Sequence, residues 1–501
     1  MSATRAPQSL RRVLRFRTIV STSTGLAYAA ISLLGCIQLA AYLAGDSAWI
    51  ALLIAGLLAL LAAFCFSELN ALYPSAAAIR LYIRSAFNER ASLIISFGYL
   101  VTVVAVIAAD SYVVGSAVSC FSQQCYTHGT ILQNPGPDTY IWILALLALA
   151  TAANLLGIRI AGLVQDIATY ALLISLAIIS FIALSKSGFH LHQPTAALHS
   201  PVNLIQAVAV GVFVFSAFEW VTPLSEEMTD TRLIPRGMFV ALGLLFLSYS
   251  LFTVASTNLV GIQHLCQNVG TDNVICSNVP QMLLGWQALG QTGALWMLLA
   301  TLLTGVMTFN GGFAAASRFM YAAAREATLP PFFARLSYAR VVPWAAVVSL
   351  AAASAVIAVV VALTQSFNAL ILVGAVLEAM IYAVAGLCVL VLRNRQSDTQ
   401  RSFLIPLGPV IPVATIVIFS LLGVIAAVTL TPVRIGGAQV LLPVPLAITA
   451  AIFLLSFLYV QYYVPRLKAA DEARRAARTP RRPRRQAAEE TEPTAPLPEQ
   501  E

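Results

Sequence analysis

Long apolar runs alternate with short polar segments along almost the whole chain, from near Ile19 to near Tyr463. Each run has the length of about 20 residues that an α-helix needs to cross the hydrocarbon core of a bilayer. Backbone groups in lipid have no water to bond, so runs of this length predict helices, and they lack the ten-residue alternation typical of a membrane β-barrel. We place about twelve spans, at 19–44, 48–70, 92–118, 139–158, 160–184, 202–224, 237–261, 291–316, 342–364, 366–392, 408–431 and 441–463.

The composition predicts one large membrane body. Of 501 residues, 59% are hydrophobic and 10% are charged, whereas a soluble domain carries about 25% charged residues. A soluble enzyme, a secreted disulfide scaffold and a disordered protein are therefore excluded. We expect a cytoplasmic tail at 1–17, a transmembrane domain at 18–464, and a disordered cytoplasmic tail at 465–501 that is first basic and then acidic. Its Arg cluster leaves open a contact with anionic lipid headgroups, with a merely solvated tail as the alternative.

The basic residues predict the orientation of the spans. Twelve spans place both termini on one side, and 27 of the 29 Lys and Arg residues fall on that side, leaving Lys186 and Arg434 on the other. Cytoplasmic loops carry an excess of Lys and Arg, so we expect both termini to be cytoplasmic and the membrane to be the plasma (cell inner) membrane. The net charge of +8 then reflects topology and predicts no nucleic-acid partner. The first run is too long for a cleaved signal peptide and is expected to remain as a span.

Cysteines and histidines gather in the predicted external loops. Four external cysteines could form two disulfides in an oxidising compartment, with three possible pairings: Cys120, Cys125, Cys266 and Cys276. The other three lie within spans: Cys36, Cys65 and Cys388. All five histidines are external: His128, His190, His192, His199 and His264. Since no acidic or thiol ligand lies near the His190–His192 pair, we expect solvated histidines and no metal site.

Acidic residues within spans need an explanation, because ionisable groups at membrane depth are costly and commonly mark a pathway or a buried partner. The candidates are Asp110 in the third span, Glu219 in the sixth and Glu378 in the tenth, while Glu68 lies near the cytoplasmic end of the second. For Asp110 and Glu378, a hydrogen-bonded packing role and a functional role both stay open.

Two spans contain residues that interrupt helices. The first holds four consecutive hydroxyl residues and a glycine, Ser21–Gly25, followed by Tyr28. The sixth mixes aromatic, small and acidic residues with a proline between Phe213 and Pro223. Interrupted spans at corresponding positions of two halves indicate an inverted-repeat transporter with its site at mid-membrane. Half-helix N-termini favour a carboxylate and half-helix C-termini an ammonium, which together describe an amino acid.

Five segments in order resemble the amino acid–polyamine–organocation (APC) permease superfamily over most of the chain. They are Ser67–Leu69 with Tyr73–Ser75; Asn154–Arg159 with Val164–Asp166; Phe218–Glu219 with Ser225–Met228 and Ile234–Arg236; Asn310–Gly311 with Ser317–Arg318, Tyr321, Ala324–Glu326 and Leu329–Pro330; and Leu392–Arg395 with Arg401, Phe403 and Pro406.

The resemblance implies a five-plus-five inverted repeat with broken helices 1 and 6, two trailing helices and an alternating-access cycle. It places substrate binding at Ser23, Thr24, Gly25, Tyr28, Phe215, Ser216, Ala217 and Glu219, with Phe215 as an aromatic gate. It further implies that Glu226 and Glu227 hold the cytoplasmic ends together through nearby arginines; an exposed acidic helix end is the alternative.

Two departures from the family pattern bear on coupling. Ala76–Arg80 stands where many relatives carry glycines, and Leu172 stands where many carry a lysine that replaces a coupling sodium. No lysine lies in any span. The remaining coupling candidates are Glu219 and Asp110 for a proton, and Thr308 and Asn310, with Thr304, for sodium, although such polar groups also serve helix packing.

We therefore predict a secondary transporter of amino acids or related amines, in which Glu219 neutralises an amine or carries a proton; proton coupling is one of the modes left open. The partners are a small-molecule substrate, the lipid bilayer and a coupling H+ or Na+; no cofactor is expected, and the oligomeric state is open. The alternatives are an amino acid exchanger, a sensor without net transport and, less favoured, a membrane-embedded enzyme. The chain lacks the metal-ligand and nucleophile motifs of such enzymes, so we predict no enzymatic activity.

Overall fold

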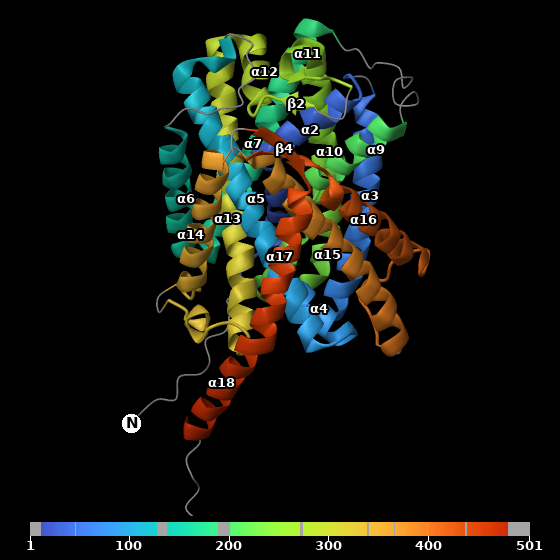
Figure 1. The fold of residues 1–501 in the computed structure, drawn as a ribbon, viewed down its shortest axis with the longest axis vertical. Helices are drawn as coiled ribbons and strands as arrows, with labels where there is room; N and C mark the ends of the chain where they lie inside the picture. Colours follow the sequence, from blue (N-terminus) through green and yellow to red (C-terminus); the bar gives the residue numbers. More distant parts are fainter. Residues whose placement is uncertain are drawn as a thin grey trace, which may run out of the picture.

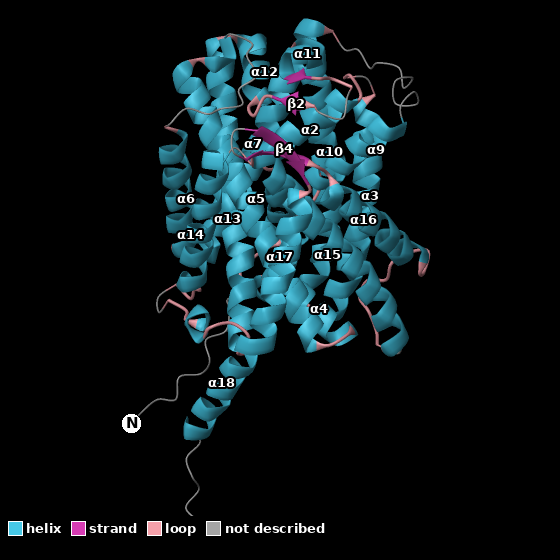
Figure 2. Cartoon of the chain, in the orientation of Figure 1, coloured by secondary structure: helices cyan, strands magenta, loops and turns pink. Residues whose placement is uncertain are grey.

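The apolar runs form long helices that lie side by side across the body of the protein (Figures 1 and 2). The computed structural model describes residues 12–45, 47–127, 138–188, 201–270, 274–337, 340–364, 366–397, 399–435 and 438–478. Within these residues, ten helices are long and apolar enough to cross a membrane, and a bent pair makes an eleventh. Helix α6 (Thr139–Leu155), with 17 residues, is a shorter apolar helix at the place of the predicted fourth span.

The unbroken spans agree with the predicted ranges and extend further at several ends. They are α3 (Ala48–Leu72), α5 (Glu89–Gln123), α6 (Thr139–Leu155), α7 (Ile158–Ser187), α10 (Ile234–Leu259), α13 (Gln291–Arg325), α14 (Trp344–Thr364), α15 (Phe367–Arg395), α16 (Val410–Val428) and α17 (Val444–Leu458).

The first span is broken, as predicted, but at a different point. Helix α1 (Phe16–Ala27) and helix α2 (Ala30–Tyr42) meet at an angle of 56°, with Tyr28 and Ala29 between them. The predicted break at Ser21–Gly25 is wrong, because those residues remain helical. The Ser21 hydroxyl donates to the Thr18 carbonyl at 3.2 Å and to Asp166 Oδ1 at 2.5 Å, so it is satisfied without unwinding the helix.

The sixth span is also interrupted. Helix α9 (Pro201–Val214) ends before Phe215, and a 3₁₀-helix, η2 (Phe218–Glu227), continues the span. Between them Ala217 has a φ of +74°, a left-handed conformation that alanine rarely adopts. Pro223 lies inside η2; because proline lacks a backbone donor, a tighter helix replaces the regular α-helix here.

The two ends of the bundle differ in their secondary structure. Figure 1 shows α4 (Ile79–Ala86) and α18 (Val464–Arg478) at one end, and α11 (Ile262–Leu265) and α12 (Pro280–Leu289) at the other. The four cysteines of the predicted external loops pair locally, Cys120 with Cys125 beside η1 (Cys125–Thr127), and Cys266 with Cys276. The second disulfide joins the antiparallel strands β1 (Cys266–Gln267) and β2 (Ile275–Cys276). Cys36, Cys65 and Cys388 are free and buried.

Short elements in the connections were not predicted. A hairpin of β3 (Thr431–Ile435) and β4 (Ala438–Leu442) links the last two spans, with Thr431 opposite Leu442. The 3₁₀-helices η3 (Thr231–Leu233) and η4 (Pro331–Ala334) lie in the loops after η2 and α13. Leu14 forms an isolated parallel bridge with Met228, which ties the segment before α1 to the end of η2.

The end of the chain is more ordered than the predicted tail. Helix α17 continues through a π-helical turn, η5 (Tyr459–Tyr463), into α18, so residues 465–478 of the predicted disordered tail are helical. Lys468 pairs with Glu89 at 2.7 Å and Arg475 with Asp471 at 2.7 Å one turn away. Such pairs support an exposed helix. Residues 479–501, with the distal part of the Arg cluster, and residues 1–11 lie outside the described residues, as do four of the five histidines: His128, His190, His192 and His199.

Candidate substrate and coupling site

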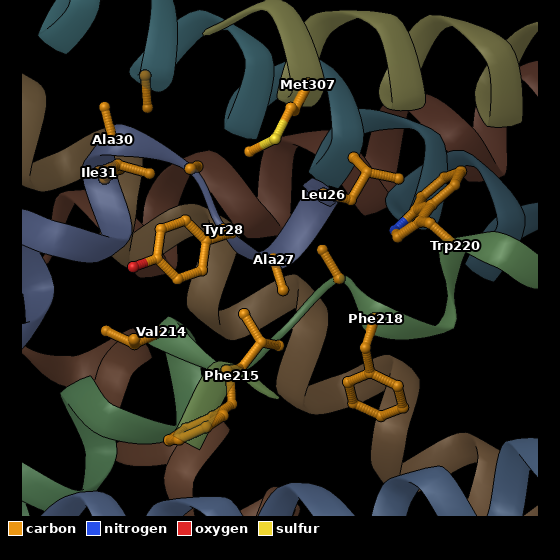
Figure 3. Packing of buried hydrophobic residues seen from close by; sticks show 14 of the residues in the cluster. Leu26, Ala27, Tyr28, Ala30, Ile31, Val214, Phe215, Phe218, Trp220 and Met307 are labelled. Atoms are coloured by element: carbon orange, nitrogen blue, oxygen red, sulfur yellow. The ribbon is translucent and has the colours of Figure 1, made fainter. Parts of the chain in front are cut away.

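The two breaks lie side by side in the middle of the protein. Figure 3 shows Ala27 and Tyr28 from the first span close to Phe215 and Phe218 from the sixth. Tyr249 of α10 joins them: its ring stacks on Tyr28 with centroids 4.9 Å apart and meets Phe215 edge-on at 5.5 Å. Its hydroxyl donates to the Ala27 carbonyl at 2.7 Å, which satisfies one acceptor exposed by the end of α1.

Glu219 lies in the first turn of η2 and is fully buried. The Tyr382 hydroxyl of α15 donates to its Oε2 at 2.8 Å, and the Tyr99 hydroxyl of α5 lies 3.5 Å from its Oε1. The indole of Trp220 stacks on Tyr99 with centroids 3.8 Å apart. The Tyr382 hydroxyl also accepts a hydrogen bond at 3.2 Å from the Ala217 N–H. One tyrosine therefore bonds both the backbone at the break in the sixth span and the carboxyl group of Glu219.

Glu378 is brought together with Glu219. It lies one turn before Tyr382 on α15, is buried, and interacts electrostatically with Glu219. Neither of its carboxyl oxygens has a partner in hydrogen-bonding geometry. Together with Ser216 and Tyr382 it lines a small cavity of about 40 Å³ between α9, α15 and α16. No ion pair among the described residues involves Glu219 or Glu378.

The side chain of Asp110, a residue of α5, lies beside the start of α2, the helix that follows the break in the first span. It is fully buried in α5, and its Oδ1 accepts a hydrogen bond from the Ile31 N–H at 3.2 Å. Its Oδ2 has no partner in hydrogen-bonding geometry, and neither has the Oγ1 of nearby Thr308. A carboxylate at this point is favoured by the partial positive charge of a helix N-terminus. Asp110 and Thr308 are therefore together, apart from the pair of glutamates.

The predicted substrate residues of α1 are buried, and Gly25 lies against α7. The hydroxyls of Ser23 and Thr24 have no partner in hydrogen-bonding geometry. A Cβ on Gly25 would lie 2.1 Å from Gln165 Nε2 and 3.0 Å from Thr169 Oγ1, so a larger residue would displace the Gln165 side chain from its bond to the Ser21 carbonyl. The Tyr28 hydroxyl is 2.6 Å from Ser248 Oγ. In the sixth span, the Ser216 hydroxyl donates to the Phe213 carbonyl at 2.7 Å within the break.

Asn310 lies apart from Asp110 and Thr308. Its amide nitrogen donates to the Ala161 carbonyl at 2.8 Å and to Gln165 Oε1 at 3.0 Å. Its amide oxygen accepts from Asn154 Nδ2 at 3.1 Å. All these partners belong to α6 and α7, so the position of Asn310 is that of a helix-packing residue rather than a free oxygen ligand.

The two gate candidates have different partners. Glu227 pairs with Arg318 of α13, with Nε and Oε2 3.0 Å apart and both side chains nearly fully buried. Glu226 accepts instead from the Ala76 N–H at 3.1 Å and the Ser75 hydroxyl at 3.3 Å. Both acids thus connect η2 to neighbouring parts of the bundle. Glu227 does so through an arginine, the predicted kind of partner, and Glu226 through the loop after α3.

Further ion pairs at the same end were not predicted. Glu68 accepts from Arg393 at 2.8 and 2.5 Å, from Arg401, and from the Ile405 N–H at 3.0 Å. The buried Arg80 of α4 pairs with Glu326 at 2.7 Å; burial lowers the pKa of this guanidinium and the carboxylate of Glu326 opposes that shift. Arg17 pairs with Asp166 at 2.9 Å.

Comparison with known proteins places this arrangement in a family. The sequence model of the "Amino acid permease" family matches residues 15–469. The Asc-type amino acid transporter 1 of Mus musculus is 26% identical over 375 residues, which is 72% of this chain and 66% of that protein, just under two-thirds of its length. The serine/threonine exchanger SteT of Bacillus subtilis is 24% identical over 388 residues, covering 74% of this chain and 81% of that protein.

A solved structure shares the fold. A Na+-coupled sialic acid symporter in a substrate-bound outward-open state matches 83% of this chain and 90% of its own, with a TM-score of 0.53 and 14% sequence identity. The matched family and relatives are transporters rather than enzymes, and the likeness to the symporter concerns the fold alone.

Proposed function

Because the chain belongs to the amino acid permease family, we propose that it is a secondary transporter that moves amino acids or related amines by alternating access. The observation that carries the proposal is the juxtaposition of two broken spans, with a buried acid, Glu219, in the first turn after the break in the sixth. Broken spans expose unpaired backbone groups only where they line a cavity or are buried in protein. The relatives named for amino acid transport or serine/threonine exchange support a substrate of this class.

The substrate site that we propose comprises the two breaks and the residues beside them. It comprises Ser23, Thr24, Gly25, Tyr28, Phe215, Ser216, Ala217 and Glu219. Tyr28 and Phe215 would close over the substrate, since both rings already meet at Tyr249. Glu219 would contact the substrate amine or exchange a proton with it, positioned by the hydroxyl of Tyr382.

The proposed coupling ion is a proton. Desolvation favours the neutral form of a carboxyl group, and Glu219 and Asp110 are both fully buried, which suits acids that gain and lose protons during transport. Sodium is the second candidate through Thr308, but Asn310, the other proposed oxygen donor, is already bonded to α6 and α7.

The cytoplasmic gate that we propose is formed by Glu226 and Glu227. Their bonds to the loop after α3 and to Arg318 hold η2 against neighbouring helices. Further charged contacts at this end of the bundle, between Glu68 and Arg393 and between Arg80 and Glu326, reinforce the closure. This end would face the cytoplasm of a plasma (cell inner) membrane, as the distribution of Lys and Arg predicts, and both termini would lie there.

Uptake into proteoliposomes tests the proposal. Labelled amino acid and amine mixtures are offered with imposed proton and sodium gradients, applied separately. Uptake driven by external acid and lost in Glu219→Gln supports a proton-coupled permease. Uptake that ignores both gradients but needs internal amino acid supports an exchanger. Absence of uptake and of exchange for every amino acid and amine contradicts the proposed function.

A further inference from the structure

An open pocket lies where α15 ends and α16 begins, and it is separate from the substrate site proposed above. Its volume is about 690 Å³. Most of its lining comes from the end of α15 and the connection that follows: Arg393, Ser397, Thr399, Gln400, Arg401 and Leu404. Among the described residues this lining contains two arginines and no acid. Guanidinium groups beside hydroxyl and amide donors suit an anionic ligand, and above all a phosphate group.

The two arginines of the pocket share a single carboxylate. Arg393 donates to Glu68 through Nε and Nη2 at 2.8 and 2.5 Å, and Arg401 donates to it through Nη1. These bonds leave Nη1 of Arg393 for a ligand. The three side chains together carry a net charge of +1. Because the Glu68 side chain is only 1% exposed and that of Arg393 is 21% exposed, it is the positive charge that reaches the pocket.

The start of α16 adds to this positive charge. Gly408 also lines the pocket, two residues before the helix begins at Val410. A Cβ on Gly408 would meet no neighbouring group within 4 Å, so the pocket is open at this point. A helix N-terminus carries a partial positive charge that favours an anion. The helix therefore reinforces the field that the arginines create.

An exposed apolar surface begins at the edge of the pocket. Leu404 of the lining is 63% exposed, and Leu407 is 73% exposed. Along α16, exposed apolar residues recur every three or four positions and therefore form one stripe of the helix: Val410, Val413, Val417, Leu421, Val424 and Val428. On a helix long and apolar enough to cross a membrane, such a stripe contacts acyl chains. The pocket thus combines an anion site with a surface for hydrocarbon.

We propose that this pocket binds the headgroup of an anionic phospholipid, with its phosphate at Arg393 and Arg401 and its acyl chains along the exposed stripe of α16. A zwitterionic lipid fits less well, because its own ammonium group meets the same guanidinium groups. A free phosphate ion would satisfy the arginines and leave the apolar stripe unused. The proposal concerns a site other than the substrate site, and it stands whichever substrate the protein carries.

Quenching of a tryptophan reporter by brominated lipids tests the proposal. Leu407→Trp places the reporter beside the pocket without changing its lining, and quenching of the six native tryptophans is subtracted using the protein without the reporter. The full chain is reconstituted in phosphatidylcholine vesicles that contain either brominated phosphatidylglycerol or brominated phosphatidylcholine. We expect the binding constant at the reporter to be about fivefold higher for phosphatidylglycerol, the factor that one basic residue contributes beside an anionic lipid. Equal constants for the two lipids overturn the proposal.

Variants of Thr399 assign the lipid preference to the pocket. Thr399→Glu adds a negative charge to the lining without removing a partner of Glu68, and it should abolish the preference for phosphatidylglycerol. Thr399→Gln has nearly the same size without the charge and should retain the preference. Ala470→Glu, at an exposed position of α18, adds the same charge elsewhere and should also retain it. A preference that Thr399→Glu leaves unchanged overturns the assignment to this pocket.

Inorganic phosphate distinguishes a lipid from a soluble ligand. The quenching is repeated with sodium phosphate and with sodium chloride at equal ionic strength, so that screening of charge is the same in both. A preference for phosphatidylglycerol that persists equally in both salts supports the lipid as the occupant. A preference that disappears in phosphate and persists in chloride assigns the pocket to a soluble phosphate and overturns the lipid proposal.

Discussion

Replacing Arg318 by methionine should separate η2 from α13 at the end of the bundle that we propose to be cytoplasmic. Arg318 and Glu227 have side chains only 1% and 2% exposed, and their Nε and Oε2 lie 3.0 Å apart. Removing one partner of such a pair leaves a buried, uncompensated charge at a cost of about 3–5 kcal/mol. Opening lets water reach Glu227 and relieves that cost. At about 1.4 kcal/mol per factor of ten, the ratio of open to closed forms should rise by about two to three orders of magnitude.

Thiol labelling measures this shift. Met228 is buried where the end of η2 meets Leu14, so a Met228→Cys reporter reacts with a water-soluble maleimide when this contact separates. The parent contains three other free cysteines, Cys36, Cys65 and Cys388, all buried; their labelling is subtracted using the protein without the reporter. Arg318→Met should accelerate labelling of the reporter strongly, while melting temperature is recorded in parallel to detect unfolding.

Two controls separate the charge effect from a general loss of packing. Arg325→Met removes an exposed arginine of the same helix and should leave the labelling rate unchanged. Arg318→Met combined with Glu227→Gln removes the uncompensated charge and should bring labelling back toward the parent rate, since replacing both partners of a buried pair is often close to neutral. The reasoning is refuted if Arg318→Met labels like the parent, or if the double variant labels as fast as the single one.

Three further predictions follow from individual contacts. Tyr382→Phe removes the donor to Glu219 and an acceptor for the Ala217 N–H. Since a hydrogen bond to a charged group contributes about 1.5–3 kcal/mol, the initial uptake rate should fall about tenfold or more. The control is Tyr462→Phe at an exposed position, and equal uptake rates in the two variants would contradict the prediction. Gly25→Ala places a Cβ 2.1 Å from Gln165 Nε2, whereas nothing lies within 4 Å of a Cβ on Gly243. Overpacking at Gly25 should reduce the free energy of unfolding by about 1–3 kcal/mol. The melting temperature should therefore fall in Gly25→Ala and not in the control Gly243→Ala. Replacing Cys266 and Cys276 by serine removes the disulfide between β1 and β2 and should reduce stability by about 2–4 kcal/mol; an unchanged melting temperature would show that this loop adds nothing.

The helices could be predicted from the sequence because the requirement is simple: a bilayer demands long apolar runs with internally bonded backbones. The positions of the breaks depend on more local contacts. Ser21–Gly25 has the composition of a break, yet Asp166 and Gln165 of α7 bond its hydroxyl and carbonyl groups and keep it helical. Only the tertiary partner decides between unwinding and packing, and a single sequence does not reveal that partner.

The candidate site could be predicted from the sequence only in part. Glu219 and Asp110 stand out as acids in apolar runs, and the sequence alone identifies them. Tyr382 could have been found as the residue one turn after Glu378 on the same helical face, but its bond to Glu219 joins residues 163 positions apart. The pair of Glu68 and Arg393 spans 325 positions. Contacts of this kind depend on the fold and leave no local pattern.

The most direct test of the proposed function is counterflow of a labelled amino acid mixture by the full chain in proteoliposomes, measured for the parent, Glu219→Gln and Glu472→Gln side by side. Glu219 is buried in the first turn of η2, directly after the break in the sixth span, whereas Glu472 is exposed on α18. We predict that the parent and Glu472→Gln accumulate labelled amino acid at similar initial rates and that Glu219→Gln is slower by at least tenfold. A rate for Glu219→Gln equal to that of the parent would contradict the claim that the broken spans and their buried acid form the substrate site.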